Sequence, residues 1–228
     1  KPNARSQSTR EKKFALPIVL GPQADEAERS AAVMLSDAVA DLVGPDLAVE
    51  RQGKLDGLAD PAVQMFLLGR DEKLSPSIAK LAGRYRKKLG DDGYAVRVDR
   101  TGVRVVANTS AGLFYAAQTL IQLLAGRGRK VSLPFCEIVD WPDFKYRGVM
   151  LDISRFRVPK MEALINFAFR LAACKINVLQ LYVEHTFLCR RHPEYSEGAS
   201  PITAEQLSEL DEICRTLHIE LQANQNSL

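Results

Sequence analysis

Three polar clusters, each placed directly after an apolar segment, are the residues of this chain best suited to chemistry. They are Asp152-Ile153-Ser154-Arg155, Glu184-His185 and Asn224-Gln225-Asn226. Guanidinium, carboxylate and amide groups offer the directional donors and acceptors that the fixed hydroxyls of a sugar require. Arg155 is the most informative, because a planar guanidinium can bind two adjacent hydroxyls. We therefore predict a substrate-binding site made of Asp152, Arg155, Glu184, His185, Asn224 and Asn226.

A purely structural role stays open for several of these side chains. Loops that follow strands are polar simply because they are solvated. Asp152 lies inside an apolar strand, where an ion pair with Arg155 is an alternative to ligand binding. Histidine suits acid and base chemistry near neutral pH, but a single one at a strand end, such as His185, often only holds a loop through hydrogen bonds.

An alternating pattern of strands and helices must position these clusters. Apolar runs predict strands over residues 148–153, 177–183 and 219–223, and helical spacing predicts helices over 160–173 and 203–217. Such β-α-β-α-β alternation indicates a parallel sheet with right-handed crossovers, in which the carboxyl ends of the strands lie at one edge. The pattern fits a doubly wound sheet or the beginning of a (β/α)8 barrel, which needs about 250 residues.

Residues 14–139 are predicted to form a separate, smaller α/β unit. Strands are expected over 14–20, 62–68, 94–98 and 103–107, and helices over 25–43, 75–89 and 111–125. The run Asn108-Thr109-Ser110 offers an N-cap for the last helix. Since the pattern changes after Pro134, we expect a basic tail over 1–13, one domain over 14–139 and a second over 140–228.

The charge distribution argues against nucleic acid and membrane partners. The net charge is +3, and most of it lies in residues 1–13, whose composition is typical of a solvated tail. No run approaches the length of about 18 apolar residues that a membrane helix needs, so a soluble chain is expected. The sequence starts without Met, which leaves export by a removed signal peptide open. It indicates no oligomeric state.

The four cysteines, Cys136, Cys174, Cys189 and Cys214, form no CxxC pair and have no histidine pair nearby at metal-ligand spacing. We therefore expect neither a metal site nor a cofactor. Cys174 and Cys214 lie in apolar periodic segments, which favours buried free thiols over disulfides.

Three motifs carry a resemblance to a known family. The run DWPDFKYRGVMLDISR, from Asp140 to Arg155, resembles the entry to the catalytic barrel of family 20 hexosaminidases, D-x-P-x-F-x-x-R-G-x-(M/L)-L-D-x-(S/A)-R-H. The run 175–179, KINVL, is similar to the family's K-x-N-x-L before the second barrel strand. Gly93-Tyr94 and the run 112–124 resemble the preceding domain, often described as zincin-like. No HExxH motif is present, so that likeness implies no zinc.

The resemblance implies a small zincin-like α/β domain followed by the first β-α-β-α-β part of a (β/α)8 TIM barrel. It also implies a retaining glycosidase that removes terminal β-linked N-acetylhexosamine, with the substrate's own 2-acetamido oxygen as nucleophile; family 20 enzymes are substrate-assisted exceptions to the two-carboxylate scheme. The assisting Asp-Glu pair follows the fourth barrel strand, so we expect no catalytic residue in this chain and no activity from it alone. Arg155 falls on the arginine that binds the terminal sugar's hydroxyls.

The chain departs from the family pattern near each strand end. Phe156 stands where His is common, and Glu184-His185-Thr186-Phe187 replaces a common T-D-D-Q. Asn224-Gln225-Asn226 takes the place of the usual E-I-D. Two alternatives therefore stay open: a sister glycosidase, O-GlcNAcase-like or α-glucuronidase-like, and a carbohydrate-binding relative without catalysis.

Overall fold

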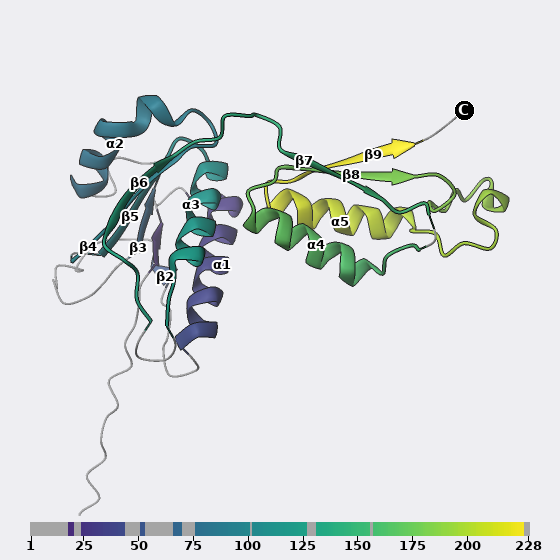
Figure 1. Ribbon diagram of the computed structural model, residues 1–228, viewed down its shortest axis with the longest axis horizontal. Helices are drawn as coiled ribbons and strands as arrows, with labels where there is room; N and C mark the ends of the chain where they lie inside the picture. Colours follow the sequence, from purple (N-terminus) through teal and green to yellow (C-terminus); the bar gives the residue numbers. More distant parts are fainter. Residues whose placement is uncertain are drawn as a thin grey trace, which may run out of the picture.

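The chain folds into a mixed α/β structure with two β-sheets (Figure 1). The computed structural model describes residues 18–20, 24–43, 51–52, 66–69, 76–100, 102–126, 131–155 and 157–225. Helices cover both faces of the first sheet and only one face of the second. None of the described helices is long and apolar enough to cross a membrane.

The first sheet has six strands in the order β2-β1-β3-β5-β4-β6. The strands are β1 (Ile18–Leu20), β2 (Arg51–Gln52), β3 (Phe66–Gly69), β4 (Tyr94–Asp99), β5 (Gly102–Ala107) and β6 (Cys136–Asp140). β4 runs antiparallel to both β5 and β6, and the remaining pairs are parallel. Gly102 has a φ of 119° at the start of β5, a conformation that favours glycine and lets β4 and β5 form a tight hairpin.

Helices pack on the two faces of this sheet because apolar side chains alternate along β4. Tyr94, Val96 and Val98 belong to the core under α1 (Glu26–Val43) and α3 (Ser110–Leu123), whereas Ala95 packs under α2 (Pro76–Leu89). The expected N-cap of α3 is confirmed: the Thr109 hydroxyl accepts a hydrogen bond from the Gly112 amide at 3.1 Å.

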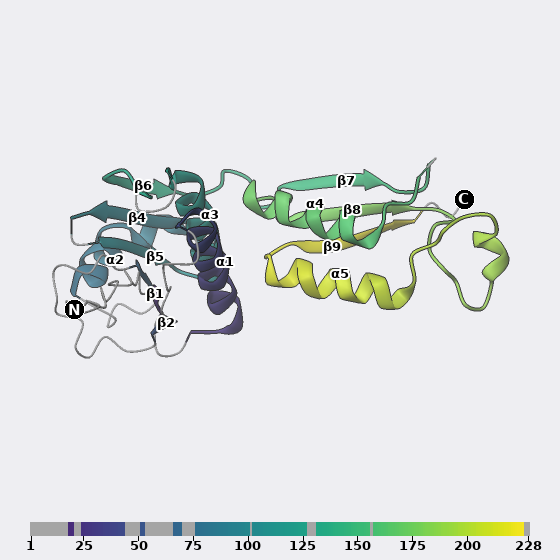
Figure 2. The same cartoon turned by 90° about the horizontal axis from the view of Figure 1, so that it is seen from below.

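The second sheet consists of three parallel strands that lie side by side in the order β7-β8-β9 (Figure 2). They are β7 (Gly148–Asp152), β8 (Val178–Val183) and β9 (Glu220–Gln225). The connections contain α4 (Met161–Ala173), the short 3-10 helix η3 (Pro193–Ser196) and α5 (Ala204–Thr216). Both α4 and α5 lie on the same side of the sheet, so its other face is open (Figure 1).

Both crossover helices end in the same way, with a non-glycine residue in the left-handed conformation. Lys175 after α4 has a φ of 59°, and His218 after α5 has a φ of 56°. The next amide then bonds back to the helix, from Ile176 to Leu171 at 3.0 Å and from Ile219 to Cys214 at 2.8 Å. Each strand can therefore start directly after its helix.

Arg147, just before β7, joins the two sheets. Its guanidinium donates to the Asp92 carboxylate at 3.1 Å, just before β4, and lies 5.3 Å from the centre of the Tyr115 ring of α3. The same group donates to the backbone oxygens of Phe144 at 2.9 Å and Lys175 at 2.8 Å. Most donors of one half-buried arginine are thus used to fix the start of β7 against the six-stranded sheet.

The structure confirms the predicted elements wherever they fall on described residues, with small shifts at their ends. Two strands, β2 and β6, were not predicted. The expectation of a buried thiol holds for Cys214 but is wrong for Cys174, which is exposed because it is the C-cap of α4 rather than a residue of its apolar face. Predictions for 1–17, 62–65 and Phe156 lie outside the described residues.

Candidate functional site

The carboxyl ends of β7, β8 and β9 lie at one edge of the second sheet (Figure 2). Asp152 at the end of β7 pairs in register with Tyr182 of β8, which in turn pairs with Asn224 of β9. Residues paired in register share a face, because side chains alternate along each strand. Asp152 and Asn224 therefore flank Tyr182 on the face that the helices leave open.

Asp152 organises the turn that carries Arg155. Its Oδ1 accepts hydrogen bonds from the Ser154 hydroxyl at 2.7 Å and the Ser154 amide at 2.9 Å, and its Oδ2 lies 3.4 Å from Nε of Arg155. The bonds from Ser154 hold the pKa of this carboxyl below its ordinary value, so it is ionised near neutral pH. The ion pair that the sequence left open is therefore present.

That ion pair leaves most of Arg155 accessible. Its side chain is 65% exposed, and only Nε faces Asp152. Within the described residues, the two terminal guanidinium nitrogens have no partner. A planar pair of donors is thus presented to solvent at the end of β7, the arrangement that can bind two neighbouring hydroxyls.

Glu184 and His185 follow the central strand. The Glu184 carboxylate accepts a hydrogen bond from the Tyr182 hydroxyl at 2.8 Å, and the Glu184 backbone oxygen accepts one from the Gln225 side chain at 3.3 Å. Glu184 is half-buried and His185 is exposed. The ends of β8 and β9 are thereby tied together, while Asn226 lies outside the described residues.

The polar residues of the open face next to this edge were not predicted from the sequence. Gln180 of β8 pairs in register with Met150 of β7 and Gln222 of β9, one row below Tyr182. The signal was present in the run VLQLYV, since a central parallel strand covered on both faces is normally apolar throughout. Two polar residues at alternate positions, Gln180 and Tyr182, indicate one face that is not covered by helices.

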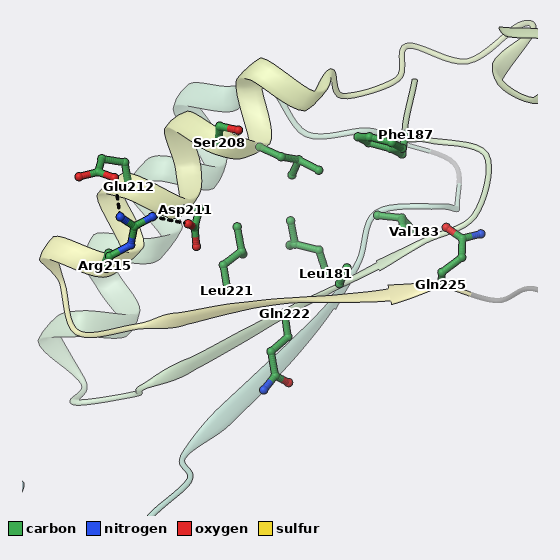
Figure 3. Close-up of a pocket in the computed structure, with 12 residues that line it drawn as sticks. Leu181, Val183, Phe187, Ser208, Asp211, Glu212, Arg215, Leu221, Gln222 and Gln225 are labelled. Atoms are coloured by element: carbon green, nitrogen blue, oxygen red, sulfur yellow. Dashed lines mark hydrogen bonds and ion pairs between the residues drawn. The ribbon is translucent and has the colours of Figure 1, made fainter. Parts of the chain in front are cut away.

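A groove of about 540 Å³ lies on the opposite, helix-covered face (Figure 3). Leu181, Val183 and Leu221 point into it from the strands, and Asp211 and Arg215 border it from α5, paired at 2.6 Å. Figure 3 shows Gln222 on the other side of β9 from Leu221. The groove is therefore separate from the edge that carries Asp152 and Asn224.

Among the described residues, no group of three or more His, Cys, Asp or Glu side chains is placed to hold a metal ion. The candidate site instead combines a guanidinium, two carboxylates, a phenol and amides, which is a set of hydrogen-bonding groups suited to a polyhydroxylated ligand.

Comparison with protein families identifies the class. Residues 2–141 match the model described as glycosyl hydrolase family 20, domain 2, which is more than half of the chain. The chain therefore belongs to glycosyl hydrolase family 20.

Relatives of known function are similar to this chain over part of their length. A β-hexosaminidase of Vibrio furnissii is 35% identical over 107 residues, covering 46% of this chain and 17% of the relative. A β-N-acetylhexosaminidase of Cellulomonas fimi is 29% identical over 158 residues, covering 68% and 30%. The chain thus spans less than a third of either relative.

Solved structures agree on the fold. A chitobiase of Flavobacterium johnsoniae superposes with a TM-score of 0.70 at 21% identity, covering 92% of this chain and 31% of the chitobiase. A mutant β-hexosaminidase of Streptomyces plicatus in complex with its product GlcNAc gives 0.70 at 22% identity, covering 92% and 41%. At this level of identity the likeness concerns the fold alone.

Proposed function

We propose that this chain is part of a glycosidase that removes terminal β-linked N-acetylhexosamine by substrate-assisted, retaining hydrolysis. Family membership supports the reaction class, and the names of the relatives support an amino-sugar substrate over the sister glycosidases. The observation that carries the proposal is the register of Asp152, Tyr182 and Asn224, which lines up the three strand ends on one open face.

Residues 14–139 would form the zincin-like domain, and residues 140–228 would supply the first three strands of a TIM barrel after a tail over 1–13. The three parallel strands, with both helices on one side, agree with a barrel wall whose open face is the interior. Arg147 would hold this wall against the first domain.

Arg155 would bind the hydroxyls of the terminal sugar through its two accessible nitrogens. Asp152 would orient Arg155, and Glu184, His185 and Asn224 would contribute further hydrogen bonds at the same edge. The acid and the acetamido-orienting carboxylate would come from residues beyond the third strand, so this chain supplies binding groups without the general acid. No metal or cofactor takes part in this scheme.

A turnover assay tests the proposal. The product of the complete reading frame should hydrolyse p-nitrophenyl N-acetyl-β-glucosaminide with release of the β-anomer first, as retention requires. The 228-residue chain alone should show no turnover, because it lacks the general acid. Absence of hydrolysis by the complete product, or hydrolysis by the short chain, would contradict the assignment.

A further inference from the structure

A series of hydrogen-bonded side chains extends across the open face of the second sheet, from the amino end of β9 to the carboxyl edge. The Gln222 amide donates to the Glu220 carboxylate at 2.8 Å. The Gln180 amide nitrogen faces the Gln222 oxygen at 3.5 Å, and the Asn224 amide nitrogen donates to the Gln180 oxygen at 3.1 Å. Four side chains on two neighbouring strands are thus connected in one direction.

The Glu220 carboxylate, at the start of the series, determines that direction. An ionised carboxylate only accepts hydrogen bonds, whereas a primary amide has a donor end and an acceptor end that can exchange by a flip. Gln222 must therefore turn its nitrogen to Glu220 and its oxygen to Gln180. By the same reasoning Gln180 turns its oxygen to Asn224, which leaves the Asn224 oxygen as the last acceptor of the series.

The hydrogen bonds of Asn224, at the carboxyl end of the series, agree with this direction. The Asn224 nitrogen is used by Gln180 and lies 3.8 Å from the Met150 sulfur. In the part of the chain that the structure describes, the Asn224 oxygen has no hydrogen-bond partner. It lies in the row of Asp152 and Tyr182, at the edge where the candidate site is formed.

Reversing a single amide would bring two nitrogens or two oxygens face to face. Reversing all three would point the Gln222 oxygen at the Glu220 carboxylate, so that two acceptors would meet. The arrangement therefore has one favoured polarity as long as Glu220 is ionised. Rotation of Asn224 alone would break the bond to Gln180, and the second N–H of this amide faces the Met150 sulfur at 3.8 Å.

We propose that Glu220, Gln222 and Gln180 are positioning residues that fix Asn224 as a hydrogen-bond acceptor, so that the sugar group it binds is a donor, a hydroxyl or the acetamido N–H. This inference rests on the proposed function. It also gives a reason for the amide at this position, where the family pattern has an acid: an oriented amide oxygen accepts as a carboxylate does, without adding a negative charge to the site.

A double-mutant cycle on stability tests the polarity without any ligand. Asn224→Asp places an acceptor against the Gln180 oxygen and should lower the Tm, and adding Glu220→Gln lets the whole series reverse. The double variant should melt at least about 2 °C above Asn224→Asp alone. Residues 220 and 224 are about 13 Å apart along the strand, which is more than the Debye length of about 8 Å at physiological salt. Direct repulsion between their charges is therefore largely screened. Coupling through the hydrogen-bonded amides should persist at high salt.

Glu209→Gln, on the exposed surface of α5, is the matched control, and it should not restore the Tm of Asn224→Asp. Additive effects of Glu220→Gln and Asn224→Asp would overturn the inference, as would equal restoration by Glu209→Gln. Both variants change a surface carboxylate to an amide, so general charge effects are the same in the two cycles.

Ligand binding by the product of the complete reading frame tests the acceptor itself. Asn224→Ala should weaken binding of N-acetylglucosamine by about 3- to 10-fold, the size of one neutral hydrogen bond. The loss should vanish for one member of a series of analogues that each lack one donor, the monodeoxy sugars and the analogue with an ester oxygen in place of the acetamido N–H. Glu220→Gln should give a smaller loss with the same dependence.

Two failures are distinguishable in that experiment. If the unaltered protein binds N-acetylglucosamine but Asn224→Ala weakens every analogue equally or none, the acceptor role is overturned and the proposed function stands. If the unaltered protein binds no amino sugar, both the proposed function and the role assigned to Asn224 are overturned.

Discussion

The two sheets of this chain differ in how they are covered. In the first sheet every residue of β5 is buried and β4 is buried along most of its length, because helices pack on both faces. In the second sheet the residues of β7 on the open face, Gly148, Met150 and Asp152, are exposed, since helices cover one face only. The covered sheet acts as a scaffold, and the open sheet presents polar groups that a ligand can reach.

The difference is sharpest within one strand of the second sheet. Leu179, Leu181 and Val183 of β8 pack toward the helices, whereas Gln180 and Tyr182 point to the open face. Neighbouring residues of one strand thus lie in different environments, packed under the helices or on the open face. Substitutions on the two faces should separate stability from ligand affinity, and the following tests are ordered by the size of the expected effect.

Leu179→Ala should cause the largest loss of stability, about 2–5 kcal/mol, because its side chain is fully buried and the substitution leaves a cavity. Met150→Ala on the open face is the control. The Met150 side chain is 58% exposed in this chain, so the substitution should lower the free energy of unfolding by less than about 1 kcal/mol. Urea unfolding of the 228-residue chain measures both, and equal losses would show that the two faces do not differ.

Arg147→Ala should come second, with a loss of about 2–4 kcal/mol, because the substitution leaves Asp92 and three backbone oxygens without their half-buried cationic donor. Arg84→Ala is the matched control, since the Arg84 side chain is 63% exposed in its ion pair with Glu137. That variant should change the free energy of unfolding by less than about 1 kcal/mol. Similar losses in the two variants would argue against a special role of Arg147 between the sheets.

Thr203→Ala should cost about 1 kcal/mol, because it removes the capping box at the start of α5. The Thr203 hydroxyl accepts a hydrogen bond from the backbone N–H of Gln206 at 3.3 Å. The side-chain oxygen of Gln206 accepts one from the backbone N–H of Thr203 at 2.9 Å. Thr203→Ser keeps both bonds and should unfold at nearly the same urea concentration as the unaltered chain. If the Ser and Ala variants behave alike, the hydroxyl has no capping role.

The smallest effect should be a pH dependence from His218, whose ring lies 5.2 Å from that of Phe114. Burial lowers the pKa of His218, although Asp25 and Asp92 raise it in part. The unfolded chain therefore binds this proton more readily, so stability is complete above about pH 6.5 and falls as the pH drops below that value.

His218→Asn tests that pH dependence, because asparagine tolerates the left-handed backbone of this position and does not titrate. The fall in Tm between pH 7.5 and pH 5.5 should be smaller in this variant than in the unaltered chain. Carboxylates with lowered pKa values, such as Asp152, lose their contribution only at more acidic pH. An unchanged fall in Tm would mean that His218 is not its source.

Much of the fold follows from local patterns in the sequence. The spacing of apolar residues predicts α1, α2, α3, α4 and α5 and the three parallel strands, because each pattern lies within one element. β6 is not predictable in this way, since Cys136–Asp140 is only partly buried and is defined by its antiparallel pairing with β4, about forty residues earlier in the chain. Pairing of this kind is a property of the tertiary structure.

The candidate site was predicted only at its rim. Polar residues after each strand were visible in the sequence, whereas the contribution of Gln180 and Tyr182 depends on which face of β8 the helices cover. The same holds for the direction of the amide chain, which needs the register of Gln180 against Gln222. Residue types indicate which groups are available, and the packing of α4 and α5 decides which of them a ligand can reach.

We propose above that Arg155, at the carboxyl edge of the open sheet, binds an amino sugar. Calorimetry should measure the Kd of an N-acetylglucosamine-type inhibitor for the product of the complete reading frame, for Arg155→Ala and for Arg170→Ala on the exposed side of α4. We expect a loss of about 1.5–3 kcal/mol in binding free energy for Arg155→Ala, as for hydrogen bonds to a charged group, and none for Arg170→Ala. An unchanged Kd for Arg155→Ala would contradict it.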